Sequence, residues 1–66
     1  MTAQSIHPYA LTIENAARYS GLSRSRIYEL MAAGDLNWFK VGSRRMILTE
    51  VLKSYLDRVA ALTRNK

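Results

Sequence analysis

The chain has 66 residues, which fits one small domain and leaves little room for the deep substrate cleft of an enzyme. It has no cysteine and a single histidine, so disulfides and zinc sites built from several of its own cysteines or histidines are excluded. Ten lysines and arginines against five acidic residues give a net charge of +5 and a pI of about 10.1, which favours a nucleic-acid partner. We expect no catalytic activity, metal or cofactor.

The hydropathy pattern and the first residues bear on location and domain limits. No apolar run approaches the ~20 residues that span a bilayer, and MTAQSIHPYA lacks the basic start and apolar stretch of a secretion signal. We therefore expect a cytoplasmic, nucleoid-associated protein with no membrane contact. Residues 1–10 are polar and without periodicity, which predicts a flexible arm. A single domain is expected over residues 11–63, followed by a basic tail at 64–66.

The first helix is predicted to begin at Ile13, because Thr12 is a favourable N-cap residue. Ile13, Ala16 and Ala17 have the i, i+3, i+4 spacing of a buried helical stripe, and the small alanines allow a second helix to approach closely. Gly21 is expected to end this helix, because glycine supplies the positive φ that a tight turn requires.

The second helix is predicted to begin after Ser23, as its N-cap, and to end at Gly34, which suits the position after a helix C-terminus. Its expected inward residues are Ile27, Leu30 and Met31. Two helices joined by a short glycine turn form the helix-turn-helix motif, whose second helix usually enters the DNA major groove.

After the second helix, the apolar spacing indicates a hairpin over residues 38–48, with its turn at Gly42-Ser43. Three side chains are expected to pack together against the helices: Phe39, Val41 and Ile47. Trp38 and Lys40 are then expected on the outward side. A two-stranded hairpin is marginal alone, so it must pack on the helices.

A last helix, capped by Thr49, is indicated by an apolar stripe. The stripe consists of Val51, Leu52, Tyr55, Leu56 and Val59. The expected fold is mainly α with a small two-stranded antiparallel wing, in the order α-α-β-β-α.

The candidate recognition residues lie at the start of the second helix, because N-terminal residues of a recognition helix reach base edges. They are Ser23, Arg24, Ser25, Arg26 and Tyr28. Arginine can hold a phosphate or a guanine edge, while the hydroxyls can bond a phosphate or a base. The alternative is a solvated helix face on which Arg26 pairs locally and Tyr28 partly packs.

The candidate wing residues lie on the hairpin and at its tip: Lys40, Ser43, Arg44 and Arg45. Two arginines beside a glycine turn can straddle a DNA backbone or enter the minor groove. Alternatively, such charges only prevent sheet-to-sheet association. Trp38 has two open interpretations, stacking on DNA sugars or covering an edge of the core.

The run LTIENAARYSGLSRSRIYELMAAGDL, followed by FKVGSRRMILTEVLKSYL, resembles the excisionase-type family of winged helix-turn-helix domains, which is related to the MerR-like DNA-binding head. The resemblance covers about Leu11 to Leu56. It implies that the helix from Ser23 to Ala33 reads the major groove and that the wing at residues 42–45 contacts backbone or minor groove. Leu48 departs from the family, because many relatives have proline there.

The resemblance also implies a biological use. Free-standing domains of this family are similar to proteins of phages, prophages and mobile elements that act in DNA recombination, bending attachment-site DNA to favour excision. Double-stranded DNA, an integrase and neighbouring copies of the chain are the partners implied. A small transcriptional regulator of the same fold is the alternative. From another class, a basic protein-interaction module also fits the charge.

Overall fold

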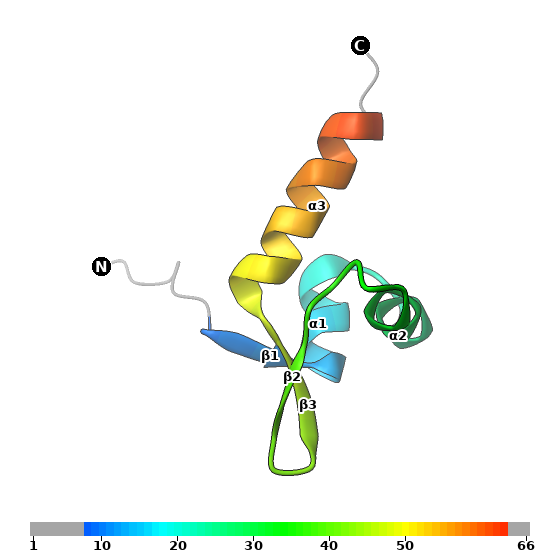
Figure 1. Ribbon diagram of the computed structural model, residues 1–66. Coiled ribbons are helices and arrows are strands. Elements are labelled where there is room, and N and C mark those ends of the chain that lie inside the picture. Colours follow the sequence, from blue (N-terminus) through cyan, green and yellow to red (C-terminus); the bar gives the residue numbers. More distant parts are fainter. Residues whose placement is uncertain (1–7, 64–66) are drawn as a thin grey trace, which may run out of the picture.

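The computed structural model describes residues 8–63, which form three helices and a small sheet (Figure 1). The elements are β1 (Ala10–Thr12), α1 (Ile13–Ser20), α2 (Arg24–Ala33), β2 (Phe39–Val41), β3 (Arg44–Leu48) and α3 (Thr49–Thr63). The sheet is antiparallel, in the order β1-β3-β2. In Figure 1 the β2–β3 hairpin projects away from the helices as a wing, while α3 extends in the opposite direction. The predicted winged helix-turn-helix fold is confirmed.

The helix-turn-helix has the predicted ends. Thr12 Oγ1 accepts a hydrogen bond from the Asn15 backbone N–H at 3.2 Å, and Ser23 Oγ accepts one from the Arg26 N–H at 3.1 Å. Gly34 ends α2 with φ +86°, and its N–H donates to carbonyls of the last turn. Because L side chains rarely adopt this left-handed conformation, glycine fixes the helix end at this residue.

The core lies where α1, α2, α3 and the sheet meet. Its buried residues are Leu11, Ile13, Ala16, Ile27, Leu30, Met31, Leu36, Ile47 and Leu52. The predicted inward residues of α2 are all among them. On α3, Leu52 is fully buried, whereas Val51, Tyr55 and Leu56 only partly cover the core. Each large apolar side chain buried in this way stabilises the fold by roughly 1.5–3 kcal/mol.

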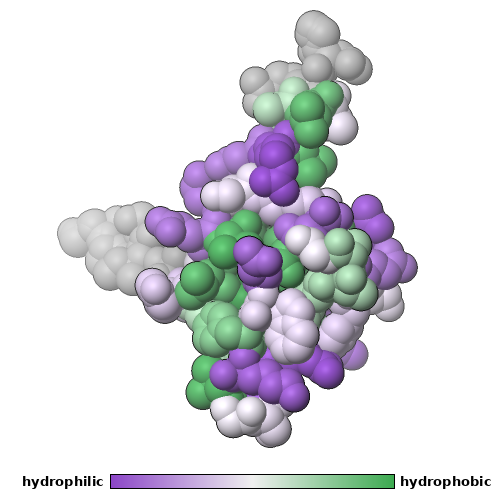
Figure 2. Space-filling model, viewed as in Figure 1, coloured by the Kyte–Doolittle hydropathy of each residue, from purple (hydrophilic) through white to green (hydrophobic). Residues whose placement is uncertain are grey.

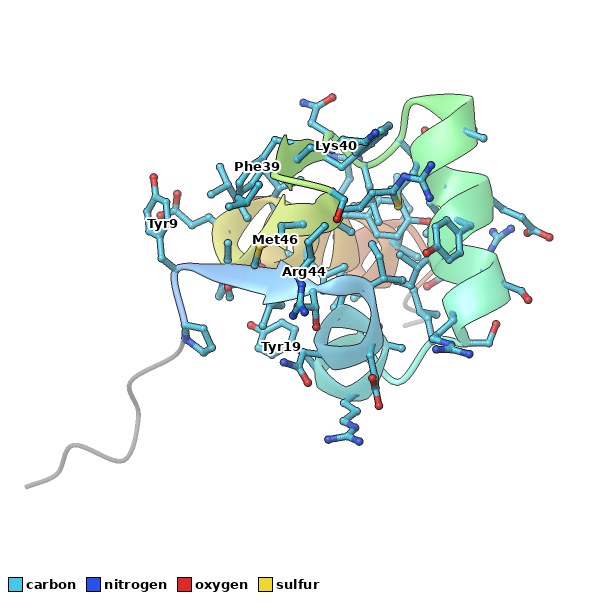
Figure 3. The ribbon with its side chains drawn as sticks, turned by 90° about the horizontal axis from the view of Figure 1, so that it is seen from below. Tyr9, Tyr19, Phe39, Lys40, Arg44 and Met46 are labelled. Atoms are coloured by element: carbon cyan, nitrogen blue, oxygen red, sulfur yellow. The ribbon has the colours of Figure 1, made fainter. Side chains whose placement is uncertain are left out.

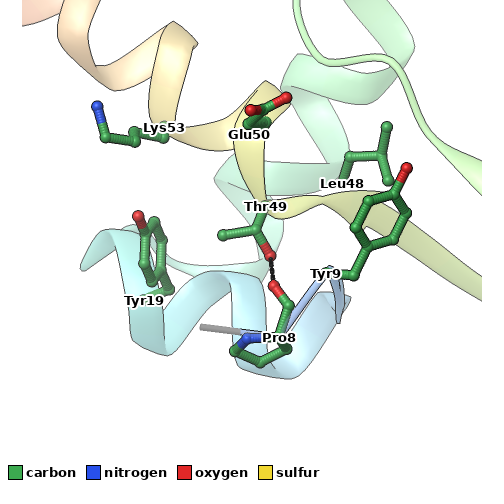
Figure 4. A pocket seen from close by; sticks show the side chains of 7 residues that line it. All are labelled: Pro8, Tyr9, Tyr19, Leu48, Thr49, Glu50 and Lys53. Atoms are coloured by element: carbon green, nitrogen blue, oxygen red, sulfur yellow. Dashed lines mark hydrogen bonds between the residues drawn. The ribbon is translucent and has the colours of Figure 1, made fainter. Parts of the chain in front are cut away.

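Residues 8–10 require a correction, because the sequence analysis assigned them to a flexible arm. Ala10 begins β1 and pairs with Leu48 of β3. The Tyr9 carbonyl accepts a hydrogen bond from the Thr49 N–H at 3.0 Å, and the buried Thr49 hydroxyl donates to the Pro8 carbonyl (Figure 4). The wing sheet therefore has a third strand that the sequence analysis missed. Residues 1–7 and 64–66, the rest of the predicted arm and the tail, lie outside the described residues.

The faces of the hairpin also differ from the prediction. Phe39 lies opposite Met46, and Lys40 lies opposite Arg45. Directly opposite residues share a face, and successive residues alternate, so Ile47 shares its face with Arg45 and Lys40. Ile47 is 0% exposed, whereas Phe39 is 37% and Val41 57% exposed. The prediction that Phe39 and Val41 pack inward with Ile47 is wrong. Lys40 is exposed, as predicted, but it shares the face of Ile47 instead of lying opposite it.

The two-residue turn explains this arrangement. Gly42, with φ +64°, and Ser43 separate Val41 from Arg44, which are paired. That pairing fixes the register of the whole hairpin. A slip of one residue would move every side chain of a strand to the other face. Phe39 must then face the same side as Met46, away from Ile47. The Gly42-Ser43 turn, correctly placed from the sequence, already implied this result.

Candidate nucleic-acid interface

The nine predicted contact residues are all exposed, and they lie at the start of α2 and on the wing. Ser23 and Arg24 stand at the N-terminus of α2, followed by Ser25, Arg26 and Tyr28. The Ser23 hydroxyl already accepts the capping hydrogen bond, but its own proton remains available for donation. The structure thus shows where these side chains lie, and their contact with DNA stays a prediction.

The first turn of α2 carries charge of an unfavourable sign. The first turns of α1 and α3 contain Glu14 and Glu50, which suit the positive end of the helix dipole. The first turn of α2 contains no acidic residue and instead carries Arg24 and Arg26. Of the three described helices, only α2 departs from this preference, and it does so at an exposed surface, so the two arginines mark a candidate site for an anion.

Arg26 has a local partner. Its Nη1 donates to Glu29 Oε1 at 2.9 Å, across the i, i+3 spacing of the helix. The hydrogen bond to Glu29 raises the pKa of the Arg26 guanidinium above its ordinary value. The two side chains are 55% and 66% exposed, and such a surface pair is weak and screened by salt. Arg26 can therefore give up its contact with Glu29 and bind an external anion instead.

Three cations among residues 8–63 have neither an ion pair nor a cation–π contact. The described ion pairs are Arg18–Glu14, Arg26–Glu29 and Lys53–Asp57, and two further arginines lie over aromatic rings. The cations left without either kind of contact are Arg24, Lys40 and Arg44. All three belong to the predicted recognition helix or wing. The positive charge that remains available for an external anion is thus concentrated on these two elements.

An open hollow of about 330 Å³ joins α2 to the tip of the wing. Its lining residues are Thr12, Ile13, Glu14, Tyr28, Ser43, Arg44 and Arg45. Arg24 lies four residues before Tyr28, which puts both on the same side of α2. The start of α2, the wing tip and the start of α1 therefore border one continuous surface. The contribution of α1 was not predicted, because only tertiary structure brings Thr12 and Glu14 to the wing.

Arg45 connects the wing to α2. Its guanidinium carbon lies 5.8 Å from the centre of the Tyr28 ring and 5.5 Å from that of the Trp38 ring. Both distances suit cation–π contacts, each worth roughly 0.5–1 kcal/mol when exposed. Trp38 is 41% exposed. The Trp38 ring thus forms part of a cluster with Arg45, a contact that was not predicted, and both interpretations of Trp38 stay open.

Arg44 and Arg45 leave β3 on opposite sides, as successive strand residues do. Arg44 is paired with Val41, and it belongs to the face of Phe39 and Met46; Figure 3 shows the placement of several of these side chains. Arg45 is paired with Lys40 and belongs to the face that packs on the helices. The two arginines therefore leave the strand on opposite faces, although both border the hollow beside α2.

The outer face of the wing is largely apolar. Phe39 and Val41 are exposed there, and Met46 and Leu48 are partly exposed. Figure 2 shows hydrophobic and hydrophilic surface adjoining each other on this side of the molecule. Lys40 and Arg45 lie on the opposite face of the hairpin. The sheet therefore separates these two charges from the apolar surface.

A second hollow, of about 310 Å³, lies beside the first turn of α3 (Figure 4). Its lining residues are Pro8, Tyr9, Tyr19, Leu48, Thr49, Glu50 and Lys53. The basic side chain among them, Lys53, donates to Asp57 at 2.8 Å. This hollow therefore adds no uncommitted positive charge to the surface formed by α2 and the wing.

Among residues 8–63 there is no group of three or more histidine or acidic side chains placed to hold a metal ion. No helix there combines the length and the apolar character needed to cross a membrane.

Comparison with known proteins now identifies the family. A family model described as a helix-turn-helix domain matches residues 10–60, which include both helices of the motif and the whole wing. The chain belongs to this helix-turn-helix family. It is also 35% identical, over 51 residues, to a probable excisionase of Saccharopolyspora erythraea. No solved structure gives a significant match.

The helix-turn-helix chain resembles that relative over only part of the relative's length. The match covers 77% of this chain and 52% of the relative, so the chain spans about half of the protein it matches. The two comparisons together confirm the excisionase-type helix-turn-helix family that the sequence analysis predicted. The family match also begins at Ala10, in agreement with the start of β1.

Proposed function

We propose that this protein binds double-stranded DNA in a sequence-specific manner, as an excisionase-type factor in recombination. The observation that carries the proposal is the concentration of uncommitted positive charge: Arg24, Lys40 and Arg44 have no acidic partner among the described residues. The similarity to a probable excisionase supports the same use. The protein would act in the cytoplasm on the nucleoid, without catalysis of its own.

In this proposal α2 enters the major groove. Arg24 and Arg26 would bind phosphates or guanine edges, while Ser23, Ser25 and the Tyr28 hydroxyl would bond phosphates or bases. The positive end of the α2 dipole adds to the attraction for a phosphate. Arg26 would exchange Glu29 for the DNA, which makes it the residue that reads sequence.

The wing would contact the backbone or the minor groove next to the site read by α2. Arg44 and Ser43 at the tip, together with Lys40, would approach phosphates, and Arg45 would lie behind them. Bending of attachment-site DNA, cooperation between neighbouring copies and contact with an integrase complete the proposed activity. These steps would favour excision of a phage or other integrated element.

A charge-matched pair of variants tests DNA binding. We expect Arg44→Ala to weaken binding to a random-sequence duplex and to reduce the slope of log affinity against log salt by about one, because one phosphate contact is lost. Lys53→Ala removes the same charge from α3, where Lys53 is paired with Asp57, and should leave the slope unchanged. Fluorescence anisotropy at several salt concentrations measures both. Equal effects of the two variants would contradict the proposed interface.

The biological role needs a separate experiment. We expect the purified protein, added to a matching integrase and its attachment-site DNA, to increase excision and to bend the DNA in a circular-permutation gel assay. Arg44→Ala should reduce both effects. If the protein binds and represses a promoter but leaves excision unchanged, the transcriptional alternative replaces the proposal. If salt-dependent DNA affinity is lacking, the chain is a protein-interaction module.

A further inference from the structure

Arg45 occupies a particular place on the wing. It lies opposite Lys40 and two residues before Ile47, on the sheet face that packs against the helices. Ile47 is fully buried, whereas Arg45 is exposed. Arg45 therefore leaves β3 at the point where the hydrophobic core ends and the free part of the wing begins.

The backbones leave a gap that the Arg45 side chain spans. Among the described elements, the backbone of α2 lies close only to that of α1, and the backbone of β2 only to that of β3. The Arg45 guanidinium lies between the Tyr28 ring on α2 and the Trp38 ring before β2, at 5.8 and 5.5 Å from the two ring centres. Outside the core, no other hydrogen bond, ion pair or ring contact joins α2 to the wing within residues 8–63.

The arginine is suited to such a contact. A guanidinium is planar and weakly hydrated, and it stacks on aromatic faces more readily than a lysine ammonium does. Arg45 has no carboxylate partner among the described residues that would draw it away from the rings. Its neighbour Arg44 lies on the other face of β3. It has neither an aromatic contact nor another partner among the described residues.

We propose that Arg45 is a positioning residue that holds the wing against α2 through Tyr28 and Trp38, rather than a phosphate ligand. The inference rests on the proposed function, because the two parts so joined are the two proposed DNA-contacting elements. With Arg45 in place, the wing tip and the start of α2 meet the DNA at a fixed separation. The ordering of the wing is then complete before the DNA binds, which reduces the entropy lost on binding.

Arg44 and Arg45 form a matched pair for the test, because they are adjacent, equally charged and on opposite faces of β3. Trp38 is the only tryptophan of the chain, so its fluorescence reports on the cluster in the free protein. We expect Arg45→Ala to change the Trp38 emission and to weaken binding to a random-sequence duplex, with the salt slope unchanged. Arg44→Ala should do the reverse, lowering the slope by about one and leaving the emission unchanged.

Variants of Trp38 provide a second test, and the single variants keep every cation. We expect Trp38→Leu to weaken DNA binding roughly twofold to fivefold, the range that corresponds to loss of one cation–π contact. Trp38→Phe keeps a ring and should bind nearly as the wild type does. The double variant Trp38→Leu with Arg45→Ala should bind no more weakly than Arg45→Ala alone, because Trp38 acts through Arg45.

Two results would overturn the inference: a salt slope lowered by about one in Arg45→Ala, which would make Arg45 a phosphate ligand, or additive effects of the Trp38 and Arg45 variants. Circular dichroism of each variant shows whether the protein remains folded, and Trp38→Phe gives a conservative variant if Trp38→Leu does not. A wild-type protein without salt-dependent affinity for DNA would instead overturn the proposed function, while the emission change in Arg45→Ala would still test the contact in the free protein.

Discussion

Arg24 is the first residue of α2, at the end of the helix dipole where a positive charge is repelled. Lys40 and Arg45 repeat the conflict on the wing, because like charges directly opposite each other on two strands are destabilising. A sequence under selection for stability alone would replace such residues. Their presence on adjoining elements supports a surface selected to bind an anion at some expense of folding stability.

We expect Arg24→Glu to separate stability from binding. The substitution places an acidic residue in the first turn of α2, as α1 and α3 already have, and should stabilise the fold by about 0.3–1 kcal/mol. It should at the same time abolish measurable DNA affinity at moderate salt. Thermal unfolding and anisotropy measure the two effects, with Arg24→Gln as the neutral control. A variant that is destabilised would show that Arg24 has a structural role.

Glu29 is expected to limit the DNA affinity of the wild type, because it holds Arg26 at 2.9 Å. We expect Glu29→Gln to free Arg26 and to remove one negative charge beside the interface, which should strengthen binding to random duplex several-fold at low salt. The gain should shrink as salt is raised, because salt screens the charges concerned. Asp57→Asn, which frees Lys53 on α3 instead, is the matched control. Equal gains in both variants would indicate only a general charge effect.

At the scale of the elements, the helices were predictable and the sheet was less so. Caps, stripes and terminating glycines are local signals, and Thr12, Ser23 and Gly34 act as the sequence indicates. Strand β1 was missed because three residues without alternation give no local signal, and its pairing with β3 depends on tertiary structure. The hairpin faces were predicted wrongly because the Gly42-Ser43 turn, rather than the hydrophobicity of the side chains, decides which residues share a face.

The candidate site shows the same division. The recognition helix and the wing were located from charge and order along the chain, and all their named residues are exposed. The contact of Arg45 with Tyr28 and Trp38 could not be predicted from the sequence, because it joins segments that are distant in the chain. The Arg26–Glu29 pair, in contrast, has a spacing of i, i+3 that could have been named in advance.

The two sides of the hairpin should respond differently to truncation. We expect Ile47→Ala to lower the free energy of unfolding by about 2–5 kcal/mol, because it leaves a cavity in the core. Val41→Ala, on the exposed outer face, should change it by no more than about 0.5 kcal/mol. Urea titration compares the two. A large loss in Val41→Ala would mean that the outer face is covered in solution.

For the whole molecule, the distribution of charge sets the salt dependence of binding. The three uncommitted cations predict a slope near −3 for log affinity against log salt, which is roughly a 40-fold loss between 50 and 200 mM salt. Anisotropy titrations with random duplex measure this slope. A slope near −1 would mean that α2 and the wing do not bind DNA together, while a much steeper slope would mean that the paired cations also contact phosphates.

The core is shared by α1, α2, α3 and the sheet, so the two proposed DNA-contacting elements and the segment at residues 8–12 belong to one folding unit. A chain of this size has little stability in reserve. The polar bonds of Thr49 to Pro8 and Tyr9 therefore add to the pairing of β1 with β3 in holding this segment in place.

The alternation of side chains along the wing restricts how this protein can diverge. Deleting one residue from β2 would exchange its two faces, turning Phe39 and Val41 toward the helices and Lys40 to the outer face of the wing. Deleting two would shorten the wing and keep each side chain on its own face. Homologous wings that retain this surface should therefore differ in strand length by even numbers of residues. Insertions of any length should be confined to the turn between Val41 and Arg44.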